Sequence, residues 1–304
     1  MSAPKTDLPP LTTGDTMHEV EPGPVDENDN MDFDPEKPRG PSSSSTNFLG
    51  LTPSTTQYIL SSLQRYSTLP PTLYFAMHYT NTALIPLATR NVAEADKYLL
   101  LTRPYYQTFP LEGLVIFAPI LTHVVSGIAL RIYRRRLAAR RHGAETHAQR
   151  KEMPWPKVSA ISALGFALYP MFVAHVLTMR IIPKKVEGNS AGVGLRYFAH
   201  GIAHTPVIAN AGYAVFVSIA SWHFVTGAAK FLRVSREYIT EPGQTGAVKR
   251  KWRARMINAL AATVAAVWVA GGLGVVGRAG KGVGWEASSW DKIYKTVPLL
   301  GKMF

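Results

Sequence analysis

The sequence predicts an all-α integral membrane protein, a five-helix transmembrane bundle built from a duplicated two-helix unit and a fifth helix. Three observations lead to this fold class: apolar runs of membrane-spanning length, two of these runs that repeat each other, and a polar N-terminal segment. The chain has 304 residues, 46% of them hydrophobic, and a mean hydropathy of +0.01. Such a mean results when a polar tail is averaged with apolar runs of about 20 residues, the length that crosses a bilayer.

The duplication is clearest in two segments that each place a histidine four residues before a glycine. Residues 122–130 (THVVSGIAL) return as residues 222–230 (WHFVTGAAK), 100 positions later. Residues four apart lie on one face of a helix, so each imidazole stands beside bare backbone. His78 and His175 form a second pair, because each lies eight residues before a proline. The chain therefore repeats a two-helix unit with one histidine on each helix.

Apolar periodicity and length predict one helix at the membrane interface and five that cross the membrane. In the interfacial helix, at 57–68, one face is apolar, and Gln64 and Arg65 are expected to face out. That apolar face consists of Tyr58, Ile59, Leu63 and Tyr66. The five crossing helices are expected at about 72–87, 110–132, 158–182, 206–232 and 256–276. The last is rich in Ala and Gly, which let helices pack closely in lipid.

These helices divide the chain into five segments. The first, 1–57, is rich in Pro, Ser, Asp and Glu and is expected to be a disordered acidic tail, because it cannot bury enough apolar surface. The others are 58–136, with the interfacial helix and first transmembrane pair; 137–157, a basic cytosolic loop; 158–233, the second pair; and 234–304, a basic loop, the fifth helix and a C-terminal tail.

Lysine and arginine are densest in two loops, the one after the second crossing helix and the one after the fourth. Both loops lie on the same side as the N-terminal tail, so the positive-inside rule places that tail in the cytosol and, after five crossings, the C-terminus on the other side. Five arginines beside the first loop are either contacts to anionic lipid headgroups or ordinary topology determinants; these are Arg134, Arg135, Arg136, Arg140 and Arg141. We expect no nucleic-acid partner.

Four histidines fall inside the crossing helices, where an ionisable side chain is costly and marks a functional site by default. Tandem two-helix repeats run parallel, so His78 and His175 should come to one depth, and His123 and His223 to another. Two facing imidazoles on opposed helices are the ligand set for the iron of haem b. Small residues admit the porphyrin, and Gly127 and Gly227 fit that need for His123 and His223.

The alternative is that these are neutral histidines hydrogen-bonded across the bundle to Asn81, Thr122, Thr178 or Ser126. The four-histidine arrangement, over about residues 70–277, resembles the membrane anchor of succinate dehydrogenase and fumarate reductase. That family is a five-helix cytochrome b that holds two haems by histidines on four helices. The resemblance implies electron transfer through a di-haem b-type cytochrome.

Two further histidines, His200 and His204, are one helical turn apart and could begin a metal site, but no third ligand is evident. The other interpretation is an interfacial helix that packs under the bundle. The chain has no cysteine, which excludes disulfides, thiolate metal sites and cysteine nucleophiles. No nucleophile elbow, Walker loop or Rossmann glycine pattern is present, so apart from a redox role through haem we expect no enzyme.

Within the tail, Pro22 and Pro24 form a Pro-x-Pro motif, with Met17 and Val20 just upstream. Proline favours an extended conformation that docks through side-chain pockets or edge pairing. The alternative interpretation is that this segment is a linker without a binding role.

Together, the doubled histidine helix pair, this motif and the basic loops resemble a fungal family of mitochondrial outer-membrane adaptors that compensate for loss of the tether between the endoplasmic reticulum and the mitochondrion. The resemblance implies a lipid-homeostasis role at membrane contact sites, in which the tail recruits the bridge-like lipid-transfer protein called vacuolar protein sorting thirteen. Pro22 and Pro24 would be the motif prolines, and Val20 and Met17 pocket residues. It also implies a multi-pass protein with its C-terminus in the intermembrane space. A lipid scramblase is a further alternative, motivated by polar Thr80, Asn81 and Thr82 in the first crossing helix.

Overall fold

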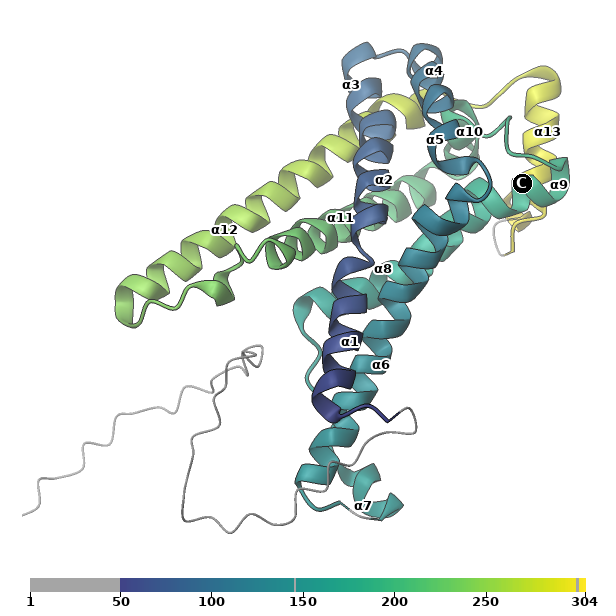
Figure 1. Ribbon diagram of the computed structural model, residues 1–304. Coiled ribbons are helices and arrows are strands. Elements are labelled where there is room, and N and C mark those ends of the chain that lie inside the picture. Colours follow the sequence, from purple (N-terminus) through teal and green to yellow (C-terminus); the bar gives the residue numbers. More distant parts are fainter. Residues whose placement is uncertain (1–49, 145, 299–300) are drawn as a thin grey trace, which may run out of the picture. The chain divides into compact units, whose positions relative to one another are not determined.

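The computed structural model describes residues 50–304 except 145, 299 and 300. The described residues are helical, without a strand among them, and belong to one compact unit (Figure 1). Most of the predicted disordered tail, 1–57, lies outside the described residues, as do its motif residues Met17, Val20, Pro22 and Pro24. Its last five residues, 53–57, are helical instead, because Thr52 caps α1 there.

The α-helices follow one another as α1 (Pro53–Tyr66), α2 (Leu69–Tyr79), α3 (Ile85–Thr89), α4 (Val92–Thr102), α5 (Pro104–Gln107), α6 (Ala118–Arg141), α7 (His147–Glu152), α8 (Ala160–Val176), α9 (Ile182–Glu187), α10 (Leu195–His204), α11 (Pro206–Phe231), α12 (Gly243–Trp268) and α13 (Gly284–Lys295). Wider, π-helical turns join several of them: η1 (Thr80–Leu84), η2 (Glu112–Phe117), η3 (Leu177–Ile181) and η5 (Val269–Val275). Short 3₁₀ turns are η4 (Arg236–Tyr238), η6 (Val276–Arg278) and η7 (Gly301–Met303).

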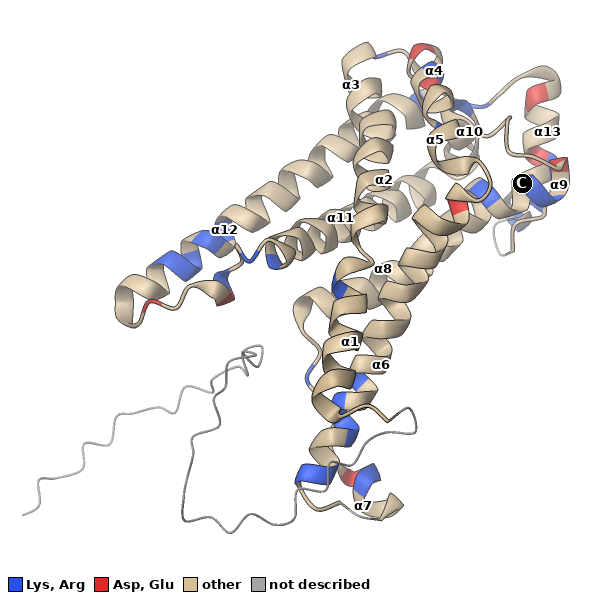
Figure 2. Ribbon diagram, in the orientation of Figure 1, with Lys and Arg blue, Asp and Glu red and all other residues tan. Residues whose placement is uncertain are grey.

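Four helical runs in the described part of the chain are long and apolar enough to cross a membrane: Glu112–Arg141, Ala160–Glu187, Pro206–Tyr238 and Gly243–Arg278. They cover the second to fifth predicted helices except for the first two residues of the second and of the third, and they extend beyond the predicted bounds into basic sequence. Figure 2 shows Lys and Arg at the far ends of α6 and α12. The basic residues up to Arg141, some of which were predicted to lie in a loop, therefore continue the helix of the span Glu112–Arg141.

The first predicted crossing helix, 72–87, lies within a continuous helical run, Leu69–Thr89, made of α2, η1 and α3. This run is not among the four apolar spans. Prolines at its start and the polar Thr80, Asn81 and Thr82 in its middle lower its apolar content. It packs along η5 and the adjoining end of α12, where the indole N–H of Trp268 donates to Thr82 Oγ1 at 3.1 Å.

Three of the π-helical turns share one cause in the sequence. Each ends two residues before a proline, namely Pro86, Pro119 and Pro183. Inside a helix, proline lacks an N–H donor and its ring clashes with the carbonyl four residues earlier, and a locally widened turn relieves both problems. The helix therefore continues past Pro86 to Thr89 and past Pro183 to Glu187, beyond the predicted ends at 87 and 182.

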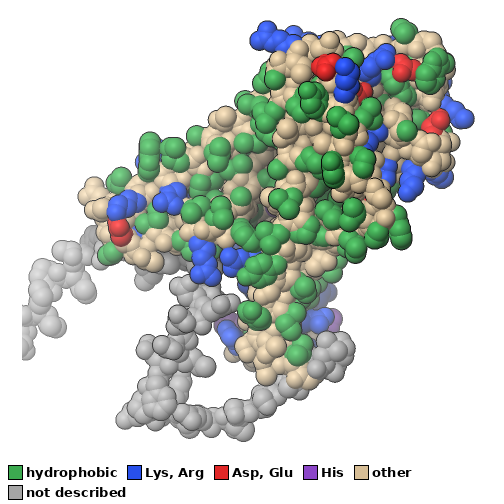
Figure 3. Space-filling model, turned by 45° about the horizontal axis from the view of Figure 1, so that its top comes forward, with side chains coloured by type: hydrophobic (Ala, Val, Ile, Leu, Met, Phe, Trp, Pro, Cys, Tyr) green, Lys and Arg blue, Asp and Glu red, His purple; other side chains and the backbone are tan. Residues whose placement is uncertain are grey.

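The paired helices of each repeat lie side by side. α1 packs along α6, and α8 packs along α11, whose other side is covered by α12 (Figure 1). Much of the outside is apolar, since hydrophobic side chains spread over the visible face in Figure 3. Small side chains dominate the span Gly243–Arg278, as predicted. A Cβ on Gly271 would overlap the backbone of Ala83.

The predicted orientation of α1 is wrong. Its apolar residues Tyr58 and Tyr66 are 62% and 54% exposed, while Gln64 and Arg65 are half-buried. Arg65 Nη2 donates to the carbonyl of Phe231 on α11 at 3.0 Å, and its guanidinium lies 5.0 Å from that ring. A helix surrounded by lipid turns apolar side chains outward and satisfies its polar ones against neighbouring helices.

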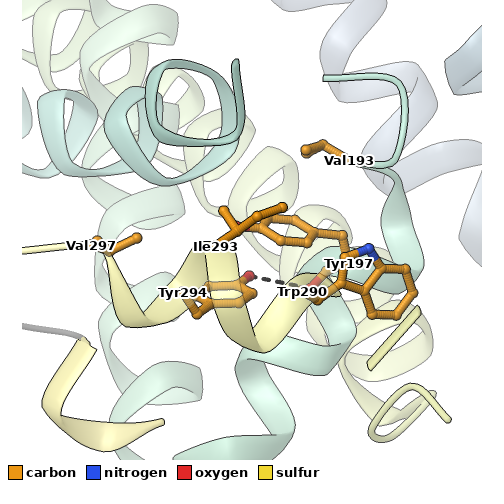
Figure 4. Close-up of a cluster of buried hydrophobic side chains, with 6 residues drawn as sticks. All are labelled: Val193, Tyr197, Trp290, Ile293, Tyr294 and Val297. Carbon is orange, nitrogen blue, oxygen red and sulfur yellow. Dashed lines mark hydrogen bonds between the residues drawn. The ribbon is translucent and has the colours of Figure 1, made fainter. Parts of the chain in front are cut away.

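The best-buried aromatic cluster lies where the C-terminal helix α13 packs on α10 (Figure 4); it consists of Val193, Tyr197, Trp290, Ile293, Tyr294 and Val297. The Tyr294 hydroxyl donates to the Tyr197 carbonyl at 3.1 Å, and the Tyr197 hydroxyl donates to the Thr178 carbonyl at 3.1 Å. Burial raises the pKa of both tyrosines, so both stay neutral donors. Gly201 lies so close to Tyr294 that a Cβ there would overlap its hydroxyl.

Candidate cofactor site between paired histidines

The structure brings together both histidine pairs that the repeat predicts. The ring centroids of His123 on α6 and His223 on α11 are 6.3 Å apart, with the rings inclined by 74°. Those of His78 on α2 and His175 on α8 are 6.1 Å apart, inclined by 66°. The two pairs involve four different helices, as the doubled unit requires.

Backbone carbonyls orient the first pair. His123 Nδ1 lies 2.9 Å from the carbonyl oxygen of Gln64, and His223 Nδ1 lies 3.2 Å from that of Ile161. Because a carbonyl oxygen can only accept, each Nδ1 must carry the proton and donate it. Each neutral ring then keeps Nε2 as its free lone pair, which is the arrangement that second-shell hydrogen bonds impose on metal-binding imidazoles.

The two anchors are themselves related by the duplication. Gln64 lies 14 residues before His78, and Ile161 lies 14 residues before His175. The unit that repeats therefore includes the end of α1, and this end with α2, η1 and α3 corresponds to α8, η3 and α9. The buried polar residues Asn81 and Thr178 are related by the same offset of 97 positions.

The two glycines predicted to admit a flat ligand lie against the neighbouring helix instead. A Cβ on Gly127 would be 2.7 Å from Nε2 of Gln64, and one on Gly227 would be 3.7 Å from Cδ1 of Ile161. The glycine that makes room for an imidazole is Gly165 on α8, where a Cβ would be 2.9 Å from Cε1 of His223. No sequence motif pointed to Gly165.

Aromatic rings enclose the second pair. Tyr74 stacks on His78 at 5.5 Å with an angle of 19°, and Trp268 approaches the same ring edge-on at 6.2 Å. Phe216 packs on His175 at 5.5 Å. Nδ1 of His175 is buried without a hydrogen-bond partner, and an unpaired buried polar atom of this kind costs free energy unless a ligand satisfies it.

The hydrogen bonds predicted between these histidines and nearby polar side chains are not formed. Thr122, Ser126 and Thr178 each donate to a carbonyl four residues earlier in their own helix. Asn81 donates to the Thr102 hydroxyl at 2.8 Å. Of the three polar residues that motivated the scramblase hypothesis, Asn81 and Thr82 are bonded within the protein, whereas Thr80 is exposed.

The spacing of both pairs fits haem iron. Metal bonds to imidazole nitrogen of about 2 Å on either side of one iron would place the ring centroids roughly 6 Å apart. The anchored Nδ1 atoms leave Nε2 of His123 and His223 available, which also fits. At Gly127, a porphyrin edge would have to displace the Gln64 side chain.

A third side chain joins His200 and His204, although the sequence alone gave no candidate. His200 Nε2 lies 2.8 Å from Asp291 Oδ1 on α13, and His204 Nε2 lies 3.3 Å from the same oxygen. The three could hold a metal by proximity. However, the backbone N–H of Gly282 donates to His200 Nδ1 at 3.0 Å, so in the neutral ring Nε2 carries the proton and donates to Asp291. His200 and Asp291 therefore form a hydrogen-bonded brace between α10 and α13, and His204 Nε2 lies beside it without a hydrogen bond to a described residue.

The five arginines predicted as lipid contacts lie in the second half of α6. Arg134, Arg136, Arg140 and Arg141 are exposed. Arg135 is different, because its guanidinium lies 4.2 Å from the Trp155 ring and donates to the Met153 carbonyl at 2.9 Å. It fixes the connection between α6 and α8.

One comparison with known proteins bears on this site. Residues 170–281 match the family model described as the MDM10-complementing protein 1 transmembrane domain. This segment is similar to that transmembrane domain. The match includes His175 and His223, one member of each pair, and confirms the predicted resemblance to a family of mitochondrial membrane proteins. No curated protein and no solved structure matches the chain.

Proposed function

We propose that this protein is an adaptor of the mitochondrial outer membrane that acts in lipid homeostasis. The observation that carries the proposal is the match of residues 170–281 to the MDM10-complementing protein 1 transmembrane domain. The described helices would form the anchor, and the N-terminal tail would recruit a lipid-transfer protein of the vacuolar protein sorting thirteen type through Pro22 and Pro24, with Met17 and Val20 as pocket residues.

The proposed anchor crosses the membrane five times, with the N-terminus in the cytosol and the C-terminus in the intermembrane space. The duplication supports the first crossing, because the span Ala160–Glu187 corresponds to residues 63–90 when shifted by 97 positions. Lys and Arg in the last turns of α6 and the first turns of α12 support the orientation (Figure 2).

Replacing both motif prolines tests the adaptor function. In cells that express Pro22→Ala with Pro24→Ala, the lipid-transfer protein should no longer collect at mitochondria, because the extended conformation that docks is lost. The same double change at Pro9 and Pro10, which lack an intervening residue, is the matched control. Undiminished recruitment by the Pro22 and Pro24 variant would refute the proposal.

A second function is favoured by the geometry of the histidine pairs: the bundle holds haem b, with His123 and His223 as one ligand set and His78 and His175 as the other. Bound haem would supply reversible one-electron transfer. The protein's own part is to fix the imidazoles by the carbonyls of Gln64 and Ile161 and to exclude water from around them.

An absorption spectrum tests this second function. Full-length protein produced with haem supplied should show a reduced-minus-oxidised Soret difference, and His223→Ala should remove about half of it because one of two sites is lost. His147→Ala, which removes an exposed histidine, should leave it unchanged. A colourless preparation that is monodisperse and melts cooperatively would contradict haem binding.

A further inference from the structure

A recess lined by cations lies at the end of the spans that is remote from the α6 to α8 connection. Two adjoining hollows there, of about 530 and 410 Å³, share Arg180 and Lys184. The first lies beside Glu112, Phe117 and Lys185, and the second reaches Arg103. Nothing in the predicted histidine or tail sites involves these residues.

The back wall of the recess is rigid. Arg180 on η3 forms a bidentate ion pair with Glu112 on η2, at 2.5 and 2.6 Å, and both side chains are only 17% exposed. The third nitrogen of Arg180 donates to Gln107 Oε1 at 3.3 Å and to the Ser190 hydroxyl. Glu112, the only acid that lines either hollow, is therefore neutralised by Arg180.

Three cations remain without a carboxylate partner at this place. Arg103 donates through Nη1 to the carbonyls of Ser190 and Ala191, at 3.0 and 3.3 Å, and its Nε is buried without a partner. Lys184 and Lys185 are exposed and form no ion pair or hydrogen bond with the described part of the chain. The charge of Asp96 acts on Arg103 and offsets part of it, so the excess positive charge of the recess rests mainly on Lys184 and Lys185.

The surroundings are those of a membrane interface. The spans Glu112–Arg141 and Ala160–Glu187 have one end each at the recess. Phe117 and Ile181, which line the first hollow, are 38% and 45% exposed, and Leu100 beside the second is 45% exposed. Apolar side chains at the mouth of a basic pocket match a ligand that is anionic at one end and apolar at the other.

We propose that this recess binds the phosphate of an anionic phospholipid. Lys184 and Lys185 contact the phosphate oxygens, Arg103 adds its charge from the deep side, and the acyl chains lie over Phe117 and Ile181. Basic pockets between transmembrane helices bind lipid headgroups in this way, and charge-assisted hydrogen bonds to phosphate oxygens are among the stronger ones in proteins. The site lies at the end of the spans that is remote from the α6 to α8 connection, and it does not depend on the adaptor function or on haem.

Binding of a fluorescent short-chain phosphatidic acid to the full-length protein in a zwitterionic detergent tests the proposal. Lys184→Ala with Lys185→Ala should weaken binding roughly thirtyfold, since two cations near a phosphate together contribute about 2 kcal/mol and 1.4 kcal/mol is tenfold. Lys292→Ala with Lys295→Ala is the matched control, because it removes two exposed lysines and the same net charge from α13. The control should bind like the unchanged protein.

Two further arms identify the ligand. Inorganic phosphate should compete only weakly, and a phosphatidylcholine probe should not bind, because the site needs both a net negative headgroup and acyl chains. Equal losses in the two double variants would refute the site, since the effect would then be a general charge effect. Tight binding of inorganic phosphate alone, with no gain from acyl chains, would refute the lipid assignment.

Discussion

Backbone groups, more than side chains, hold the polar residues of this bundle in place. His123 and His223 donate to carbonyls of Gln64 and Ile161, and Arg65 donates to the carbonyl of Phe231. A carbonyl on a neighbouring helix is present whatever residue carries it, so such an anchor survives duplication and divergence. This explains how Gln64 and Ile161 serve the same purpose in the two repeats.

The ion pair between Glu112 and Arg180 should be the most sensitive polar contact. Glu112→Gln leaves the charge of Arg180 half-enclosed without its counter-ion, and loss of one partner of a buried pair typically costs about 3 kcal/mol or more. The unfolding midpoint in detergent should therefore fall. Glu94→Gln breaks the exposed pair with Lys97, whose side chain is 66% exposed, and should change stability by less than about 1 kcal/mol. Similar falls of the unfolding midpoint in both variants would show that the ion pair of Glu112 stabilises the protein no more than an exposed ion pair does.

His204 should make stability depend on pH. Burial first, and then Lys281 and His200, lower the pKa of His204, although Asp291 opposes this. The unfolded chain, with a histidine pKa of about 6.5, then takes up a proton more readily than the folded one, so stability falls as pH drops below about 6.5. Unfolding midpoints between about pH 7.5 and pH 5 should fall less steeply in His204→Gln.

The control for that measurement is His147→Gln, since His147 is exposed at the start of α7. It should keep the slope of the unchanged protein. If His204→Gln kept the same slope as well, protonation of His204 would not contribute to acid sensitivity.

At the scale of whole helices, prolines and glycines determine the local geometry of the spans. Pro86, Pro119 and Pro183 each follow a π-helical turn, and such turns rotate the residues that come after them relative to those before. Glycines in η5 let the span Gly243–Arg278 approach η1, where a Cβ on Gly271 would overlap the backbone of Ala83. The duplicated bundle and its extra helix are thus joined by backbone contact.

Gly271→Ala should weaken this junction. The added methyl group must push η5 and η1 apart, and overpacking of this kind costs about 1–3 kcal/mol. Gly274→Ala is the matched change, because its Cβ would lie 3.7 Å from the nearest atom, an ordinary contact. Thermal unfolding should separate the two variants by several degrees. Equal midpoints would mean that η5 moves freely against η1.

At the scale of the whole molecule, the number of crossings decides which side the tail occupies. If residues 63–90 cross, the start of α1 and the connection around α7 lie on one side, and α13 lies on the other. If they do not cross, the start of α1 lies with α13. The four apolar spans of the described chain are common to both arrangements.

Single cysteines distinguish the two arrangements cleanly, because the natural chain has none. In intact mitochondria, Ser54→Cys and Ala148→Cys should both react with a membrane-impermeant maleimide, and Ser288→Cys should react only after the outer membrane is opened. All three positions are exposed. Labelling of Ala148→Cys without Ser54→Cys would contradict five crossings.

Residue spacing alone determined the helical class, the duplication and the pairing of His78 with His175 and of His123 with His223. These are consequences of helix period and repeat offset, which can be counted along one chain. Which atoms meet across helices depends on rotation and packing, and local sequence does not encode these. Tertiary structure therefore decided that Gln64 faces inward, that Asp291 reaches His200 and His204, and that Glu112 meets Arg180 beside an unbalanced cluster of cations.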